Sequence, residues 1–389
     1  MDQMRVVRVP LGERAYSIRI GEGLLSGLGQ DCERLGLGRR CTIISDSNVA
    51  PLYARLAARS LERVGFEPRE ITIPAGETAK CLARVSDCYH ELARHRVGRD
   101  SFIVALGGGV VGDLAGFVAA TYLRGLPLVQ VPTTLLAQVD SSVGGKVGVN
   151  LKAGKNLVGA FHQPRLVICD LATLETLPPR ELRAGFAEVI KYGIIADSRL
   201  FRRLERDVDR LLRRDGDALA AVVARCCAIK AAVVCQDETE QGRRAILNFG
   251  HTVGHALEAV FGYGKYLHGE AIAIGQVFAA RLSARLLGLP EDDVDRIRSL
   301  FERAGLPTSV CLSRRQWEDV SRAMRLDKKT SAGEIRFVLA ERIGRVIWGR
   351  AVPASVMREV FDLLACKPSG VERKQDGDGS RGDCRVASS

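Results

Sequence analysis

The sequence predicts an α/β protein in which a doubly wound parallel sheet precedes a mostly helical second half. Up to about residue 177, short apolar runs alternate with helical stretches, which is typical of parallel strands covered on both faces. Beyond "LPPRE" (177–181) strand signals nearly vanish and long helical periodicities follow, for example at 217–235 and 269–288. The predicted strands lie at 41–45, 70–73, 102–106, 128–131 and 166–169.

The end of the chain adds two predicted features. The extended runs "EIRFVLA" (334–340) and "RVIWG" (345–349) predict one small hairpin. From Lys367 on, the sequence is polar, rich in glycine and serine and almost without apolar residues, which predicts a disordered tail. We therefore expect one domain over 1–177, a second over 178–366 and a tail over 367–389.

Composition excludes several classes of protein. A chain of 389 residues with 46% hydrophobic and 26% charged residues is an ordinary globular protein. No apolar run approaches the roughly 20 residues of a membrane span, and the first twenty residues do not form a secretory signal. The eleven cysteines include no CxxC pair, which favours reduced thiols and a cytoplasmic location. The net charge of +11 comes from basic residues interleaved with acids, so we expect neither a membrane nor a nucleic-acid partner.

A glycine run in the first half favours a dinucleotide site. The segment "FIVALGGGVVGDLAGF" passes from a buried strand through glycines 107–109 into a helix that contains Asp113. Glycines at such a turn let the backbone approach a pyrophosphate, and the helix N-terminus offers free N–H groups. Asp46 ends a second strand, where a carboxylate can accept ribose hydroxyls, and residues 133–134 place two hydroxyls at the end of a third. A simple tight turn remains the alternative for the glycines.

This arrangement differs from two common nucleotide motifs. In a Rossmann fingerprint the ribose acid follows the glycine loop by about 20 residues, whereas Asp46 precedes it. The segment "SSVGGKVG" is not a P-loop, because Asp140 stands where that motif requires glycine and Lys146 is not followed by Ser or Thr. Nucleoside triphosphate hydrolysis is therefore not predicted.

Three of the six histidines fall within eighteen residues: His251, His255 and His268. The first two are four apart, so on a helix they share a face that suits two ligands of one metal. An HxxxH pair with no glutamate after the first histidine is only weakly specific, however. Glu188, with Lys191 one turn further on, offers a carboxylate, and two histidines with one carboxylate are a usual catalytic zinc set. The spacing leaves open which histidines bind metal.

Several basic residues have no evident surface role. Each is expected to be solvated if taken singly, but grouped around glycine turns they would bind an anion. They are Lys146, Lys191, Lys230, Arg244 and Lys328.

Six long motifs, in order, carry a family resemblance that runs from about Asp46 to Gly344. They resemble the 3-dehydroquinate synthase family of sugar phosphate cyclases, which implies an NAD-binding α/β domain joined to a mostly helical metal-binding domain. The motifs are "GGGVVGDLAGF" (107–117), "VPTTLLAQVDSSVGGKVGVN" (131–150), "GKNLVGAFHQP" (154–164), "GFAEVIKYG" (185–193), "LNFGHTVGHALE" (247–258) and "LHGEAIAIG" (267–275).

The resemblance implies an activity in the shikimate pathway of aromatic amino acid biosynthesis. The family converts 3-deoxy-D-arabino-heptulosonate 7-phosphate to 3-dehydroquinate and phosphate by transient oxidation with NAD, phosphate elimination, re-reduction and intramolecular aldol closure. A divalent metal, zinc or cobalt, is the second cofactor. Each enzyme is a homodimer, in which the residue matching Arg124 reaches the neighbouring active site.

The resemblance also assigns the site residues. Glu188, His251 and His268 match the metal ligands, whereas His255 matches a residue that works in proton transfer near the substrate. Lys146, Asn156, Arg244 and His255 are expected on the substrate's phosphate side, and Lys230 and Lys328 nearer its carboxylate. The expected catalytic and substrate-contacting residues are Asp140, Lys146, Lys191, Lys230, Arg244, Asn248, His255, Lys328 and Arg124. The expected NAD contacts are Asp46, Asn48, Gly76, Glu77, Lys80, Gly108, Gly109, Val110, Val111, Gly112, Asp113, Thr133, Thr134, Lys146, Lys155, Asn156, Thr173, Leu174, Glu175 and Thr176.

Three alternatives stay open at this point. One is another cyclase of the same group, forming an inosose or a valiolone from a different sugar phosphate. The second is a metal-dependent polyol dehydrogenase of the same fold, which would release NADH. The third is a catalytically silent NAD-binding protein. The full basic set, with Lys230, Arg244 and Lys328 present, favours a substrate that carries a carboxylate.

Overall fold

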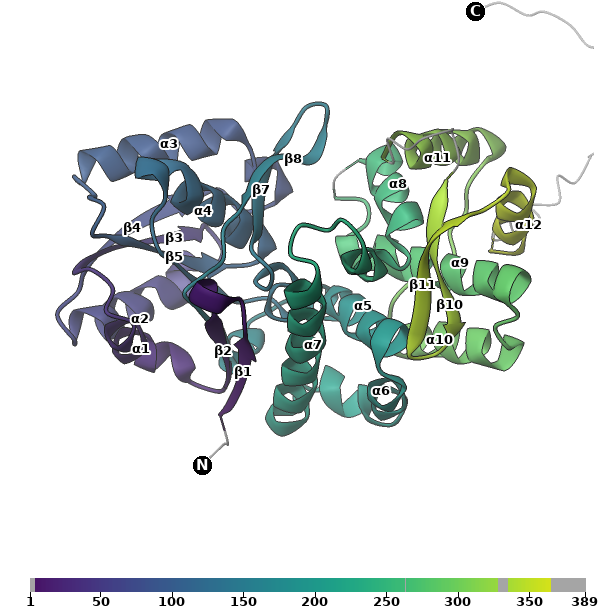
Figure 1. The fold of residues 1–389 in the computed structure, drawn as a ribbon, viewed down its shortest axis with the longest axis horizontal. Helices are drawn as coiled ribbons and strands as arrows, with labels where there is room; N and C mark the ends of the chain where they lie inside the picture. The colour runs from purple at the N-terminus through teal and green to yellow at the C-terminus, as the bar shows by residue number, and fades with distance from the viewer. Residues whose placement is uncertain (1–3, 263, 328–334, 365–389) are drawn as a thin grey trace, which may run out of the picture.

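A computed structural model describes residues 4–262, 264–327 and 335–364 (Figure 1). Lys328 and the predicted tail lie outside these ranges. Within them the predicted architecture is confirmed: an α/β half with a mostly parallel sheet is joined to a half built mainly of helices. The sheet's last strand along the chain ends at Asp170 and the next long helix begins at Pro179, and we keep 177/178 as the proposed domain limit.

The sheet has seven strands in the order β1-β2-β9-β6-β5-β3-β4. All five predicted strands are present, and they are mutually parallel. A two-strand edge, β1 and β2, was not predicted: β1 is antiparallel to β2, and β2 is parallel to β9. The strands are β1 (Arg5–Val9), β2 (Tyr16–Gly21), β3 (Arg40–Asp46), β4 (Glu67–Ile73), β5 (Phe102–Gly107), β6 (Leu128–Pro132) and β9 (Leu166–Asp170).

Helices cover both faces of this sheet, because successive side chains of a strand point to opposite faces. In β3 and β5, Ile44 and Ile103 pack with α3 (Leu82–Arg94) and α4 (Gly109–Thr121). Their neighbours Ile43 and Val104 pack on the other face with α1 (Leu28–Arg34) and α2 (Ala50–Glu62). The doubly wound prediction is therefore confirmed.

Two hairpins stand outside the sheet. The predicted one, β10 (Arg336–Arg342) with β11 (Arg345–Ala351), packs against the helical half. The other, β7 (Lys146–Leu151) with β8 (Gly154–Phe161), was not predicted as strands. It packs on α4 so closely that a Cβ on Gly116 would lie 2.3 Å from Val147 Cγ1. In Figure 1 its tip extends toward the helical half.

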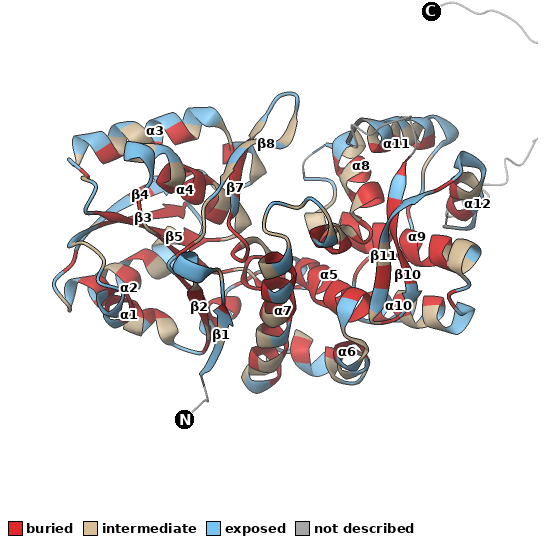
Figure 2. Ribbon diagram, viewed as in Figure 1, coloured by how far each residue is buried: buried red, intermediate tan, exposed pale blue. Residues whose placement is uncertain are grey.

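The helical half shares one large core with β1, β2 and β9. One of its helices, α7, is apolar and long enough to cross a membrane by length and composition, contrary to the sequence-based expectation, but 67% of that segment is buried inside the protein (Figure 2). It is therefore a core helix. The helices are α5 (Pro179–Ala196), α6 (Ser198–Leu212), α7 (Gly216–Gln236), α8 (His251–Phe261), α9 (His268–Leu287), α10 (Glu291–Arg303), α11 (Arg314–Asp327) and α12 (Ala354–Leu364).

Three of these helices approach one another at glycines. A Cβ on Gly269 of α9 would lie 1.9 Å from the carbonyl oxygen of Ala184 in α5. A Cβ on Gly275 of α9 would lie 2.0 Å from the carbonyl oxygen of Gly250, the residue before α8. No side chain fits at either crossing, so α5, α8 and α9 are held at backbone contact.

We predict that Gly269→Ala lowers the free energy of unfolding by roughly 1–3 kcal/mol, because the new methyl group must push the α5 backbone away. Gly216→Ala at the start of α7 is the matched control. Its Cβ would also meet an atom at 1.9 Å, but that atom is the side-chain Oε1 of Glu22, which can turn aside. Denaturant titration of both variants measures the difference, and equal midpoints would contradict the close-packing argument.

Candidate active site

The carboxyl ends of β3 and β5 form a topological switch point. The helix after β3, α2, covers one face of the sheet, whereas the helix after β5, α4, covers the other. Where the chain leaves two neighbouring parallel strands toward opposite faces of the sheet, a crevice opens in which α/β proteins bind ligands. Asp46 and glycines 107–109 flank this point, as expected. Asp46 Oδ1 accepts hydrogen bonds from the backbone N of Asn48 (2.9 Å) and of Val49 (3.0 Å).

The glycine turn closes tightly over the next strand. A Cβ on Gly108 would lie 3.1 Å from the Cγ2 of Thr134, which follows β6. The neighbouring Thr133 is buried and its hydroxyl has no hydrogen-bond partner among the described residues. Free backbone N–H groups of the first turn of α4 therefore lie beside two threonines, a set of donors suited to phosphate.

A lysine next to α4 organises the same region. Lys80 is buried, forms an ion pair with Asp113 of α4 and donates to Asn156 Oδ1 at 2.6 Å. Burial raises the pKa of Asp113, and Lys80 opposes that shift. Glu77 Oε1 accepts from Asn150 of β7 at 2.8 Å, and the Asn150 backbone N donates to Lys80 O at 2.9 Å. The segment after Gly76 and the β7–β8 hairpin are therefore joined by both side-chain and backbone hydrogen bonds.

Among the remaining residues expected to contact NAD, some could do so only through the backbone and others through a polar side chain. Val111 and Leu174 have fully buried side chains that belong to the apolar cores, so a contact there would run through the backbone. The hydroxyl of Thr176 shares a 2.6 Å hydrogen bond with Tyr53, and the hydroxyl of Thr173 donates to Asp170 O at 2.7 Å. Asn48 and Glu175 are exposed, and Val110 is partly exposed.

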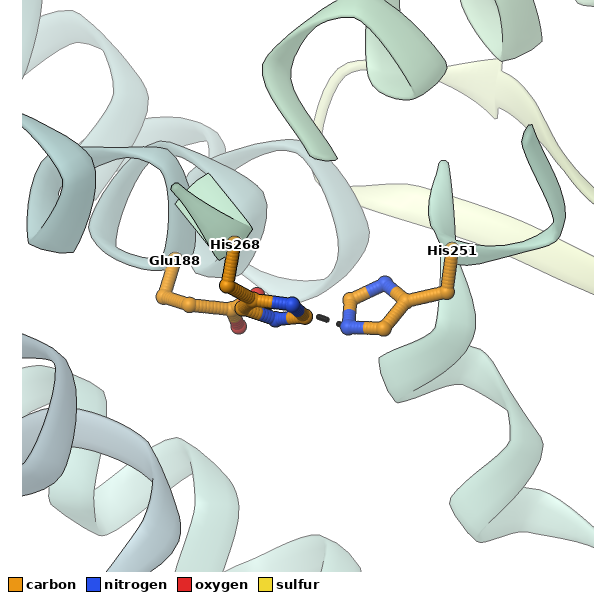
Figure 3. Close-up of side chains that lie close together, drawn as sticks. All are labelled: Glu188, His251 and His268. Atoms are coloured by element: carbon orange, nitrogen blue, oxygen red, sulfur yellow. Dashed lines mark ion pairs between the residues drawn. The ribbon is translucent and has the colours of Figure 1, made fainter. Parts of the chain in front are cut away.

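In the helical half, the three residues predicted as metal ligands converge (Figure 3). Glu188 comes from the middle of α5, His251 begins α8 and His268 begins α9. The Glu188 Oε1 atom lies 3.4 Å from His251 Nε2 and 3.8 Å from His268 Nε2. The set supplies one carboxylate oxygen and two imidazole nitrogens, which fits zinc or cobalt.

The other nitrogen of each ring is already engaged. His251 Nδ1 lies 3.2 Å from the carbonyl oxygen of Phe249, and His268 Nδ1 lies 3.1 Å from Glu258 Oε2. Both partners can only accept, so each Nδ1 carries the proton and each Nε2 is left to bind metal. Such outer contacts set the tautomer and orientation of metal-binding histidines.

Burial and nearby charges shift the pKa values of all three residues of this triad. Burial alone would raise the pKa of Glu188, but the ion pair with Lys191, together with His268 and His251, lowers this pKa to about 2. Burial and the nearby Lys191 charge lower the pKa of His251 to about 3. Burial opposes the charged form of His268 too, yet Glu188 and Glu258 raise its pKa to about 9. Metal binding at neutral pH therefore displaces a proton from His268.

A second triad overlaps the first. His255, Glu258 and His268 also offer three ligand atoms close together. In that set the available atoms are already paired: Glu258 Oε1 accepts from Lys155 at 2.8 Å, and Oε2 faces His268 Nδ1. The geometry thus favours Glu188, His251 and His268, with the His255 ring centroid 5.2 Å from that of His251.

Beside the triad, two buried lysines meet one carboxylate. Lys230 Nζ donates to Asp140 Oδ1 at 2.7 Å, and Lys191 Nζ lies 3.9 Å from the same atom. Tyr192 donates to that oxygen at 2.9 Å. Burial opposes ionisation of Asp140, but the two lysines hold its pKa well below the usual range. Asp140 lies in the π-helical turn Ala137–Ser141 and thereby joins the sheet half to α5 and α7.

The remaining predicted polar residues form an adjoining group. Arg244 is buried, donates to Glu238 O at 2.5 Å and to Gly144 O at 3.2 Å, and burial lowers its pKa. Glu240 accepts from Asn248 Nδ2 at 2.9 Å and forms an ion pair with Lys146. The structure therefore brings Lys146, Arg244 and Asn248 together.

Arg124 does not join this group within one chain. It is exposed and follows the C-terminal end of α4. That helix has 13 residues, about 20 Å of length at 1.5 Å per residue, so Arg124 lies at the end remote from the glycine turn.

Three residues of the site were missed from the sequence: Tyr192, Glu240 and Glu258. Glu258 had a signal, because it stands seven residues after His251 and three after His255, on the same helix face. Tyr192 follows Lys191 directly, but consecutive helix residues do not predict contact with one group. For Glu240, in an irregular segment, no spacing rule applied.

Comparison with known proteins agrees with these two halves. Models of the 3-dehydroquinate synthase N-terminal and C-terminal domains match residues 70–184 and 185–330. A 3-dehydroquinate synthase from Desulforamulus reducens is 51% identical over 343 residues, which cover 88% of this chain and 95% of that protein.

Two solved structures have a similar fold. One is 2-deoxy-scyllo-inosose synthase complexed with carbaglucose-6-phosphate, NAD+ and Co2+, with a TM-score of 0.84, 28% identity and coverage of 92% of this chain and 99% of that one. The other is 2-epi-5-epi-valiolone synthase from Streptomyces hygroscopicus with NAD+ and Zn2+ bound, with a TM-score of 0.81, 26% identity and coverage of 90% and 96%.

We predict that His268→Ala purifies depleted of metal, whereas His255→Ala retains near-stoichiometric metal. Removing one of three ligands abolishes most of the affinity, while losing a proton-transfer group slows turnover by roughly 100- to 10,000-fold and spares the metal. Elemental analysis of both purified variants measures this, with His90→Ala, an exposed histidine of α3, as the control. Metal retained without His268 and lost without His255 would instead make the pair His251 and His255 the chelate.

Proposed function

The chain belongs to the 3-dehydroquinate synthase family, and we propose that it converts 3-deoxy-D-arabino-heptulosonate 7-phosphate to 3-dehydroquinate and phosphate. Its cofactors are NAD and one divalent metal ion, zinc or cobalt. By reaction class it is a phosphate-eliminating lyase of the shikimate pathway.

The observation that carries this proposal is the position of the metal triad beside a buried cationic group. Lys191 pairs with Glu188 of the triad and approaches Asp140, which also binds Lys230. A substrate with a carboxylate, a phosphate and a hydroxyl to be oxidised needs both kinds of group within one molecule's length. The switch point of the sheet would provide the binding site for the dinucleotide.

The chain's own residues then have definite tasks. Glu188, His251 and His268 would hold the metal, which supplies a Lewis acid when bound. Asp46 and the glycine turn would hold NAD at the switch point, where it would supply a reversible hydride acceptor. Lys146 and Arg244 would bind the phosphate group and Lys230 the carboxylate, and His255 would move a proton beside the substrate. Holding the substrate in one conformation is worth up to roughly 7–11 kcal/mol in such multistep reactions.

The choice among cyclases rests on similarity and on charge. The identity of 51% to a 3-dehydroquinate synthase exceeds the 28% and 26% to the inosose and valiolone synthases. Beyond the phosphate-side residues Lys146 and Arg244, the buried Lys230 gives this chain a cation for a second anionic group on the substrate. A polyol dehydrogenase stays the second candidate by fold, and it differs in releasing NADH.

We further propose a cytoplasmic homodimer. Arg124 lies at the far end of α4 from the glycine turn, so a catalytic role for it requires the active site of a neighbouring subunit. The cytoplasmic location is supported by the thiols: Cys32, Cys41 and Cys88 are buried and unpaired, and burial raises the pKa of each to about 12.

We predict that NAD acts catalytically. With the heptulosonate phosphate in large excess over NAD, each NAD supports many turnovers of the metal-loaded protein, because the hydride returns to the carbon that lost it. One phosphate is released for each substrate consumed. Phosphate release, product identification by mass spectrometry and the near-ultraviolet absorbance of NADH are followed in one reaction.

A carboxylate-free sugar phosphate, glucose 6-phosphate, is the matched control and releases no phosphate. NADH accumulating in proportion to product would indicate the dehydrogenase instead. Phosphate release from glucose 6-phosphate alone would indicate an inosose-type cyclase.

A further inference from the structure

A chain of three contacting side chains links the two halves of the protein at the metal site. Lys155 of β8 donates to Glu258 Oε1 at 2.8 Å, and Glu258 Oε2 lies 3.1 Å from His268 Nδ1. Glu258 is buried on α8, and His268 begins α9. The hairpin of the sheet half therefore touches a carboxylate that orients a metal ligand of the helical half.

The next residue of the hairpin, Asn156, connects to the dinucleotide side of the site. Asn156 accepts from Lys80, which forms the ion pair with Asp113 of α4. The ladder is irregular here, with Asn156 at a φ of 53°, and the side-chain contacts of positions 155 and 156 connect β8 to the metal side and to the dinucleotide side respectively. A shift of this hairpin changes both connections together.

We propose that Glu258 is a positioning residue for His268, and that Lys155 makes this positioning, and hence metal affinity, depend on occupancy of the dinucleotide site. This rests on the proposed function only in taking NAD and a divalent metal as the two ligands. Lys155 restrains the Glu258 carboxylate, which in turn sets the tautomer and direction of the His268 ring. A ligand that orders α4 and Lys80 keeps the hairpin, and with it Lys155, in place.

The expected coupling is positive and reciprocal. NAD tightens metal binding, and metal tightens NAD binding by the same factor, since binding free energies are linked. The Lys155–Glu258 pair is part exposed, so the coupling lies near the lower end of the usual range, about fivefold.

The first experiment tests the positioning role by metal affinity, without activity. Metal-free full-length protein is titrated with Co2+ against a chromophoric chelator, and the visible absorption of bound Co2+ reports the ligand geometry. Glu258→Ala binds Co2+ roughly 10- to 100-fold more weakly. Glu258→Gln restores part of the affinity, because its amide oxygen still accepts from His268 Nδ1. Unchanged affinity in both variants, with an unchanged Co2+ spectrum, overturns the positioning role.

The second experiment tests the link to the dinucleotide site. The Co2+ titration is repeated in the wild type, in Lys155→Met and in Lys152→Met, an exposed lysine at the tip of the same hairpin. Because Lys155 is itself an expected NAD contact, each protein is measured at an NAD concentration that its own NAD titration shows to be saturating. NAD tightens Co2+ binding in the wild type and in Lys152→Met but not in Lys155→Met. An equal NAD effect in all three proteins, or none in the wild type, overturns the coupling.

The readouts keep this inference separate from the proposed reaction. Failure of the proposed reaction would appear as the absence of phosphate release from the heptulosonate phosphate, while Co2+ affinities and their NAD dependence would be unaffected. Failure of the coupling would leave phosphate release intact in the wild type.

Discussion

The Glu188 carboxylate is completely buried, and much of the helical half is arranged so that it stays charged there. An isolated buried carboxylate is strongly disfavoured, yet this one faces an ammonium group one turn away and two imidazoles from other helices. Its Oε2 forms the ion pair with Lys191, whereas its Oε1, which faces both histidines, has no well-directed hydrogen bond among the described residues. That is the state expected of a ligand oxygen prepared for a cation, because a fully satisfied carboxylate would have to give up partners on binding metal.

This arrangement depends on how closely the helices pack. Glu188 lies one turn after Ala184, whose carbonyl oxygen faces Gly269, the residue after His268. Gly250, the residue before His251, faces Gly275 of α9 in the same way. Both metal histidines thus begin their helices beside a glycine contact, so backbone packing rather than long, flexible side chains sets the ligand positions.

Much of the fold was predictable because its signals are local. The strands 41–45, 102–106 and 166–169 are short apolar runs, and α7 and α9 have continuous helical periodicity. The β1–β2 edge was missed because Arg5 and Arg8 interrupt the valines of β1, which therefore lacks a clear strand pattern. The β7–β8 hairpin was missed because its glycines read as a loop, whereas Gly148 and Gly159 permit the two backbones to approach across the ladder.

The metal ligands also could not be chosen from local sequence signals alone. Spacing nominated His251 and His255, four residues apart, because local periodicity contains no information about which ring nitrogen is already engaged. The structure adds contacts between distant segments: Phe249 O and Glu258 lie against the Nδ1 atoms of His251 and His268, and α5 brings Glu188 to their Nε2 atoms. The family resemblance named His268, whose Nε2 faces Glu188 in the structure, while the contact of Glu258 with His268 needed the three-dimensional arrangement.

Anomalous diffraction at the zinc absorption edge, from crystals of the full chain grown with zinc and NAD, tests the central claim most directly. The account predicts one strong peak within bonding distance of Glu188, His251 Nε2 and His268 Nε2, with His268 Nδ1 still facing Glu258. A peak bound to His255 and Glu258 instead, with Glu188 left on Lys191, would contradict it.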